Sequence, residues 1–201
     1  MTHGARRAKG QRLQRQIAED LSVALGLKIQ AEPPTKPGRR VNGAVYVAEG
    51  QAADLRIRRS GQSGVDVVLL SDLARQRVVL TSKPLEVEAK NVEAWNVDAV
   101  FRYGYKALAF LSHAMRQSFR RTGDGDPIVV FGKNRRPPMA LLAYDPTDMG
   151  RKIERLSQAE WMLYPILWVP QLGTIVPWEA CVRLMQARGA VMGFAQRKEH
   201  G

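Results

Sequence analysis

The sequence predicts an α/β fold followed by a helical C-terminal extension. Three features support this: a helical apolar repeat near the start, several short apolar runs typical of strands, and one strictly alternating run. Their order along the chain is helix, strands, helix, hairpin. We expect a basic flexible arm over residues 1–8, a core over residues 9–145, and a helical and aromatic extension over residues 146–201.

The first helix is predicted over residues 9–25, where apolar residues recur every three or four positions. Gly26 lies where such a helix is expected to end. The run 65–70 is nearly all apolar, which is typical of a strand buried on both faces. Strands, or in the last case the approach to one, are expected over four short runs: 45–48, 55–59, 65–70 and 75–80.

The alternating run covers residues 85–90 and indicates a half-buried strand. Side chains alternate between the faces of a strand, so Glu86, Glu88 and Lys90 should share one face. Asp66 is the single charged residue of the preceding apolar strand, where an unpaired charge is costly. The sequence therefore suggests that Asp66, Glu88 and Lys90 act together.

The second half of the core is predicted as a long helix followed by a hairpin. The helical pattern runs over residues 97–119, and two apolar runs, 128–131 and 139–144, flank a basic, proline-containing link. In the extension, helices are expected over residues 147–161 and 178–188.

Composition limits the classes of function. The net charge is +12 and the sequence pI is about 10.3. Such a charge attracts polyanions, with nucleic acid as the first candidate and an acidic membrane surface as the second. The one cysteine, Cys181, excludes a disulfide within one chain and a cysteine-rich zinc site. No signal peptide or membrane span is evident, so a cytoplasmic setting is expected.

Two carboxylates and a lysine on adjacent strands suit a divalent metal. Mg²⁺ prefers oxygen ligands and takes one or two protein carboxylates, completing its shell with water and substrate phosphate. A metal so held activates water, and a nearby ammonium stabilises the developing charge. The alternative is that Glu86, Glu88 and Lys90 form an ordinary solvated strand face.

Several segments together resemble the PD-(D/E)XK nuclease superfamily, and within it the Holliday-junction-resolvase-like proteins of archaeal and phage type. Gly-Val-Asp at 64–66 followed by Glu-Ala-Lys at 88–90 is similar to the superfamily signature. The opening of the first helix at 9–14, the loop at 59–61 and the stretch 86–96 also resemble these proteins. The likeness covers residues 9–144.

The resemblance implies a restriction-endonuclease-like αβββαβ core with a central mixed sheet. It implies Mg²⁺ or Mn²⁺ at Asp66 and Glu88, Lys90 at the attacking water, and a homodimer that cuts branched DNA in recombination or repair. It implies no small-molecule cofactor, and a bacterial or archaeal host, with the protein encoded by a phage. Family members often carry a metal-binding Glu in the first helix, where this chain has Gln14 and Gln16; the nearest acid, Glu19, is a candidate replacement.

Basic and polar residues around these motifs are candidates for contacts with DNA phosphates. Alternatively, the basic N-terminal arm and the hairpin loop are solvated, solubilising segments. Arg56 and Arg58 precede the metal-binding aspartate and could line the same groove. The candidates are Lys9, Arg12, Arg59, Ser60, Asn91, Lys133, Arg135 and Arg136.

Two other functions stay open from the sequence. One is a nuclease on duplex or single-stranded DNA. The other is a non-catalytic, basic DNA-binding protein on the same fold, which the neutral Gln14 and Gln16 in the first helix would suit.

Overall fold

A computed structural model gives the architecture, and it describes most of the predicted core and part of the extension. The described residues are 3–30, 40–41, 43–58, 65–80, 83–91, 109–121, 125–132, 137–143, 167–169 and 173–187. The predicted helix over 147–161, most of the helical pattern 97–119 and the loop at 59–61 therefore lie wholly or largely outside them. Among the helices described, none is both long enough and apolar enough to cross a membrane.

Helices and strands follow one another in an α/β order. The helices are α1 His3–Leu25, α2 Asp72–Arg77, α4 Ala109–Arg121 and a final helix over residues 178–187. The strands of the first half are β1 Lys28–Gln30, β2 Arg40–Val41, β3 Ala44–Val47, β4 Leu55–Ile57, β5 Val67–Leu69 and β6 Leu85–Asn91. Those of the second half are β7 Asp126–Gly132, β8 Met139–Leu142, β9 Leu167–Val169 and β10 Gly173–Pro177.

The described strands form one ten-stranded mixed sheet in the order β2-β3-β1-β4-β5-β6-β7-β8-β10-β9. The pairs β1–β3, β1–β4 and β6–β7 are parallel, and the other pairs are antiparallel. The expected strands around residues 45, 55, 67 and 85, and the β7–β8 hairpin, are confirmed. The predicted α/β class with a central mixed sheet is confirmed as well.

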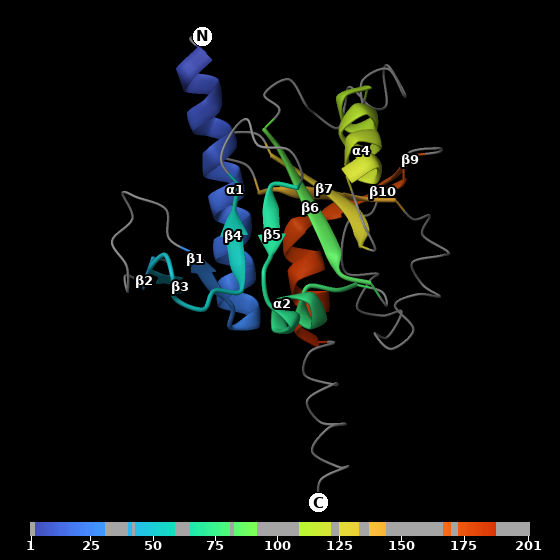
Figure 1. Cartoon of the computed structure of the whole chain (residues 1–201). Helices are drawn as coiled ribbons and strands as arrows, with labels where there is room; N and C mark the ends of the chain where they lie inside the picture. Colours follow the sequence, from blue (N-terminus) through green and yellow to red (C-terminus); the bar gives the residue numbers. More distant parts are fainter. Residues whose placement is uncertain are drawn as a thin grey trace, which may run out of the picture.

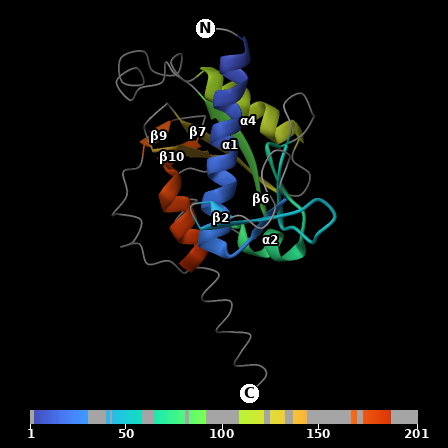
Figure 2. The ribbon, with the colours of Figure 1, turned by 90° about the vertical axis from the view of Figure 1, so that its left-hand side faces the viewer.

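Two hydrophobic cores cover the two faces of this sheet. On β7, Ile128 and Val130 join the core beneath α1, whereas Val129 and Phe131 join the core beneath α4. This alternation is the period of two that a strand imposes on its side chains. In Figure 1, α1 and α4 accordingly lie on either side of β6 and β7, and Figure 2 shows α1 beside the 178–187 helix.

The first helix is longer than its apolar repeat suggests. Leu13, Ile17 and Leu21 are buried in the main core, as predicted, and the helix ends before Gly26, whose φ of 64° favours glycine. However, the helix begins at His3, so residues 3–8, expected as a flexible arm, are helical.

Residues 75–80 were expected to be a strand or the approach to one. A strand over the whole run is wrong, because residues 75–77 belong to helix α2. The Ser71 side chain caps this helix by accepting a hydrogen bond from the Ala74 backbone N–H at 3.1 Å. Asp72 in the first turn and Arg75 in the last complement the helix dipole. These end signals outweigh the apolar residues that follow the helix.

The C-terminal extension contributes strands as well as a helix. β10 pairs antiparallel with β8, and β9 pairs with β10, so the tail widens the core sheet. Gly173 has a φ of 132°, and a Cβ there would overlap the carbonyl oxygen of Leu142. The helix expected over 178–188 is present over 178–187, and it buries Cys181 against the main core.

Candidate active site

The backbone holds Asp66 between two strands, immediately before β5. Its N–H donates to the Val87 carbonyl oxygen on β6 at 3.0 Å, and its own carbonyl oxygen accepts from the Arg58 N–H at 2.9 Å. Asp66 was predicted to lie next to the alternating strand, and it is hydrogen-bonded directly to that strand, β6.

The carboxylate of Asp66 lies against β6. Its Oδ2 accepts from the backbone N–H of Ala89 at 2.7 Å, and its Oδ1 accepts from Gln14 Nε2 on α1 at 2.7 Å. Since Ala89 separates Glu88 from Lys90, this carboxylate is fixed at the strand position flanked by the two predicted partners.

Glu88 and Lys90 lie on one face of β6, as the alternation predicts. Lys90 Nζ and Glu88 Oε1 are 2.6 Å apart. The Glu88 side chain is only 2% exposed, and that of Lys90 is 33% exposed. A solvated strand face would leave the glutamate in water, so that alternative is wrong for Glu88. The buried glutamate instead holds an ammonium that still reaches solvent.

Burial disfavours the negatively charged form of the Asp66 carboxyl group. It raises the pKa of Asp66, and the negative charge of Glu88 raises it further. The Ala89 N–H, the Lys90 ammonium and the Gln14 amide offset part of that increase in pKa. Two buried carboxylates are stabilised by nearby positive charge. Lys90 supplies one positive charge, which balances only part of the negative charge of Asp66 and Glu88.

The donor set fits a hard divalent cation. Asp66 and Glu88 supply carboxylate oxygens, and the Oε1 atom of Gln14 is buried without a hydrogen-bond partner. Within the described residues no third His, Cys, Asp or Glu completes a cluster with them. Two carboxylates are nevertheless the number Mg²⁺ commonly takes from a protein. Asp66 and Glu88 would hold the metal, with the Gln14 amide beside them.

Glu19, the candidate extra acid, does not join this site. Its Oε1 accepts a hydrogen bond from the Tyr46 hydroxyl at 2.7 Å, and α1 brings Gln14 to Asp66 instead. Gln14 and Glu19 are five residues apart, so they project about 140° apart around the helix axis.

Few of the candidate DNA-binding side chains can be placed. Arg12 is exposed on α1, and Asn91 ends β6 with a buried Oδ1 that has no hydrogen-bond partner. The Lys9 backbone is helical, but its side chain lies outside the description. Also outside the described residues are Arg59, Ser60, Lys133, Arg135 and Arg136.

Arg58 is a basic residue that the structure places next to the backbone of Asp66. Arg58 pairs with Asp66 through the backbone, and its Nη1 atom is buried without a hydrogen-bond partner. The sequence placed Arg58 in the groove only as one of several basic residues. The tertiary structure distinguishes it, because its backbone N–H bonds to Asp66 and, among the described residues, its Nη1 is the one guanidinium nitrogen that is buried without a hydrogen-bond partner.

Comparison with known proteins agrees with this geometry. The family described as phage putative PDDEXK endonuclease matches residues 5–164, which include both carboxylates, the lysine and the first helix. Neither a curated protein nor a solved structure matches the chain. A match over most of the sequence shows that the chain belongs to the phage putative PDDEXK endonuclease family, and its chemistry is that of a nuclease.

Proposed function

We propose that this protein is a Mg²⁺- or Mn²⁺-dependent endonuclease that hydrolyses phosphodiester bonds in branched DNA such as Holliday junctions. The observation that carries the catalytic part is the anchoring of the Asp66 carboxylate on the Ala89 N–H, between Glu88 and Lys90. Preorganised groups of this kind need no rearrangement during the reaction.

Each side chain has a distinct task in this proposal. A divalent cation at Asp66 and Glu88 would supply an activated water and neutralise charge on the scissile phosphate. Lys90, oriented by Glu88 and partly exposed, is placed to orient that water or to stabilise the developing negative charge. Arg58 is suited to hold a phosphate oxygen, since a guanidinium binds phosphate in two-pronged fashion.

Two features favour DNA, and branched DNA among its forms. The net charge of +12 gives strong attraction to a polyanion, which should weaken steeply as salt rises. The resemblance to Holliday junction resolvases supports the branched substrate. Such a junction needs two symmetric cuts, which a two-fold homodimer with two equal sites would supply.

The test compares a labelled four-way junction, a nicked duplex and a single strand, each with Mg²⁺ or Mn²⁺. We expect paired, symmetric cuts across the branch. Asp66→Asn and Lys90→Ala should lose cleavage while binding the junction. Lys28→Ala, at an exposed position on β1, is the matched control and should cleave normally.

The same experiment separates the alternatives. Cleavage confined to duplex or single strands would replace the proposed substrate class. Tight binding without cleavage in either metal would favour a non-catalytic DNA-binding protein, the function to which the neutral Gln14 also points.

A further inference from the structure

Strands β4 and β5 are covered by a described helix on one face only. Leu55 and Ile57 of β4 and Val67 of β5 pack into the main core beneath α1. The core beneath α4 is built from α4 and from strands β7 to β10, and it includes no described residue of β4 or β5. In Figure 1, α1 accordingly lies behind these two strands, and α4 lies to one side of them. Their second face is therefore open in the part of the chain that the structure describes.

Two arginines project from this open face beside the active site. Side chains alternate between the faces of a strand, and the neighbours of Arg56 point into the core, so Arg56 and Arg58 share the other face. The Arg56 side chain is exposed, and the Arg58 Nη1 atom is buried without a hydrogen-bond partner. Arg58 also joins the site through its backbone N–H, which donates to the Asp66 carbonyl oxygen at 2.9 Å. The two arginines therefore lead away from Asp66 along β4.

Lys90, the lysine of the active site, lies on the same face. It pairs in parallel register with Phe131 of β7, and Phe131 packs beneath α4. Residues that lie opposite each other on neighbouring strands place their side chains on the same face of the sheet. Lys90 is partly exposed, so it reaches solvent on the side that carries Arg56 and Arg58. A phosphate held near Lys90 can therefore belong to a DNA strand that continues over β4 and β5 without crossing the sheet.

The charges along β4 change sign with distance from the active site. Arg58 is nearest to the site, Arg56 follows, and Asp54 lies at the far end of the strand. Asp54 accepts hydrogen bonds from the Ser71 hydroxyl at 2.6 Å and from the Lys28 backbone N–H at 2.8 Å. Two residues of a strand span about 6.7 Å, so the two arginines can contact separate phosphates of one DNA strand. The basic part of this face therefore ends after the second arginine.

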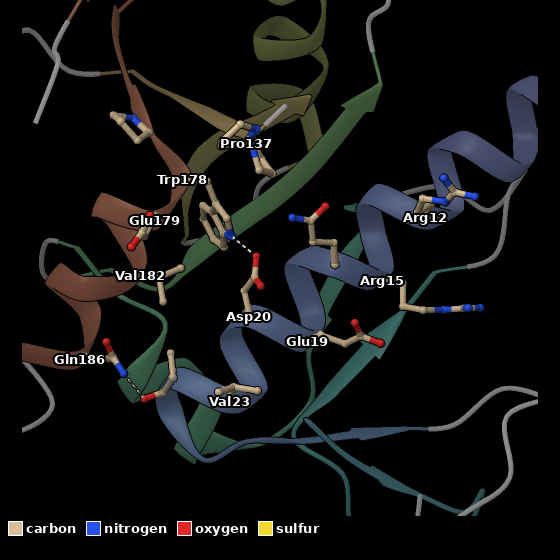
Figure 3. Close-up of a pocket in the computed structure, with 14 residues that line it drawn as sticks. Arg12, Arg15, Glu19, Asp20, Val23, Pro137, Trp178, Glu179, Val182 and Gln186 are labelled. Carbon is tan, nitrogen blue, oxygen red and sulfur yellow. Dashed lines mark hydrogen bonds between the residues drawn. The ribbon is translucent and has the colours of Figure 1, made fainter. Parts of the chain in front are cut away.

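A groove between α1 and the 178–187 helix is the alternative path for DNA. It has a volume of about 800 Å³, and Arg12 and Arg15 line it on the N-terminal part of α1 (Figure 3). Three acids, Glu19, Asp20 and Glu179, line the same groove. Carboxylates repel the phosphates that the arginines would attract. The groove is therefore a poor path for a polyanion.

Arg12 also projects away from the active site. Gln14 donates to Asp66 Oδ1 at 2.7 Å, so the direction of Gln14 from the helix axis marks the side of α1 that meets the site. Arg12 is two residues from Gln14, which places it about 160° away around the axis. Helix α1 therefore presents an amide to the site and this exposed arginine to the opposite side.

We infer that the DNA strand cut at the active site continues across the open face of β4 and β5, where Arg58 contacts one phosphate and Arg56 the next. The inference rests on the proposed function and deepens it, because it names the path of the substrate beside that site. Contacts of this kind hold the DNA backbone and carry no information on base sequence. They position the strand for cleavage, and they add to binding through the release of counterions from the phosphates.

The test is the salt dependence of binding to a labelled four-way junction in EDTA, where the metal needed for cleavage is absent. Each lost phosphate contact reduces the steepness of log affinity against log salt by about 0.9. Arg56→Ala should therefore lose about 0.9 in slope and bind about tenfold more weakly at about 0.1 M salt. Arg56→Lys should keep most of both, because it keeps the charge. The double variant Arg56→Ala/Arg58→Ala should lose about twice as much slope as Arg56→Ala, because the two side chains contact separate phosphates.

Arg183→Ala removes an exposed arginine from the last helix, on the side of the sheet that carries the main core, and it is the matched control that should keep the wild-type slope. Thermal unfolding checks that each variant folds, which is expected for Arg56→Ala because this side chain is exposed. An unchanged slope in Arg56→Ala, or an equal loss in Arg183→Ala, would overturn the inference. A loss in Arg12→Ala that Arg56→Ala does not share would overturn it too, because the DNA would then follow α1.

The outcome is distinguishable from a failure of the proposed function, because binding in EDTA does not require cleavage. A protein whose salt slope depends on Arg56 but that never cuts DNA with Mg²⁺ or Mn²⁺ would refute the proposed function and keep this path. A protein that cuts junctions while Arg56→Ala keeps the wild-type slope would do the reverse. A protein that does not bind DNA would refute both.

Discussion

Asp66, which Gln14 of α1 contacts, and Asp20 of α1 itself lie in surroundings that are alike in four respects. Each carboxylate is partly buried, each lies near another acid, and burial raises the pKa of both. Each also accepts a hydrogen bond from a neutral side chain, Gln14 for Asp66 and Trp178 for Asp20.

The difference lies in what completes each cluster. At Asp66 a backbone N–H, a lysine and an uncompensated amide oxygen come from two elements, which favours a small cation and a phosphate. At Asp20 the charges that act on its pKa are those of Glu19 and Glu179, and its side-chain hydrogen-bond donor is the indole N–H of Trp178. Similar desolvated aspartates thus lie in different surroundings, and only those of Asp66 suit the metal site proposed above.

The largest expected effect is on metal binding, which should depend on Asp66 and not on Asp20. Asp66→Asn should abolish Mn²⁺ binding measured by isothermal titration calorimetry, and it should slow cleavage by at least about a hundredfold. Asp20→Asn should bind Mn²⁺ as wild type does. Equal metal affinities in the two variants would contradict the distinction drawn here.

The second prediction concerns the neutral amide beside Asp66. Gln14→Glu adds a negative ligand, so Mn²⁺ should bind about tenfold more tightly, and Gln14→Leu should weaken binding by a similar factor. Without metal, the third carboxylate should lower the Tm of Gln14→Glu, and Mn²⁺ should restore it. An unchanged Mn²⁺ affinity in both variants would place Gln14 outside the metal site.

The third prediction follows from the pKa of Asp20. Its value rises from 3.8 in an unfolded chain to about 6 in the fold, so the folded chain binds more protons between these values. The stability that Asp20 contributes therefore falls as pH rises through this window, and the cost of its charge is complete above pH 6. Asp20→Asn should equal wild type near pH 4 and exceed it in stability at pH 7.5.

Urea unfolding at several pH values measures this difference. An advantage of Asp20→Asn that is constant with pH would contradict the raised pKa.

The smallest expected effect is at the exposed ion pair beside the groove. Arg183 Nη2 and Glu179 Oε1 are 2.6 Å apart, but their side chains are 62% and 68% exposed. Arg183→Ala should change the free energy of unfolding by no more than about 0.5 kcal/mol, because solvent screens such pairs. A cost of several kcal/mol would mean that this end of the groove is more buried than the single chain shows.

Local sequence predicted most of the described core. The spacing of Leu13, Ile17 and Leu21 located α1, and the alternation over residues 85–90 located β6 and its two faces. It failed over residues 75–80, where apolar residues suggested a strand although Ser71 caps a helix. Apolar content alone does not distinguish a short helix from a strand, whereas capping residues do.

The site was predictable only in part. Asp66, Glu88 and Lys90 were recognisable from their spacing, because alternation puts residues 88 and 90 on one face. The contact between Gln14 and Asp66 spans 52 residues of sequence, and that between Asp20 and Trp178 spans 158. Contacts between residues so far apart depend on how elements pack, which local periodicity does not specify.

The sequence by itself determined the nuclease family, the charge that attracts DNA and the faces of the individual elements, since periodicity and motif spacing are local properties. Only the tertiary structure decided that the Gln14 amide contacts Asp66 and that the tail extends the sheet through β10. It also decided that basic and acidic side chains line one groove along α1. The physical reason is that burial and desolvation depend on every element around a residue, so they exist only once the chain has folded.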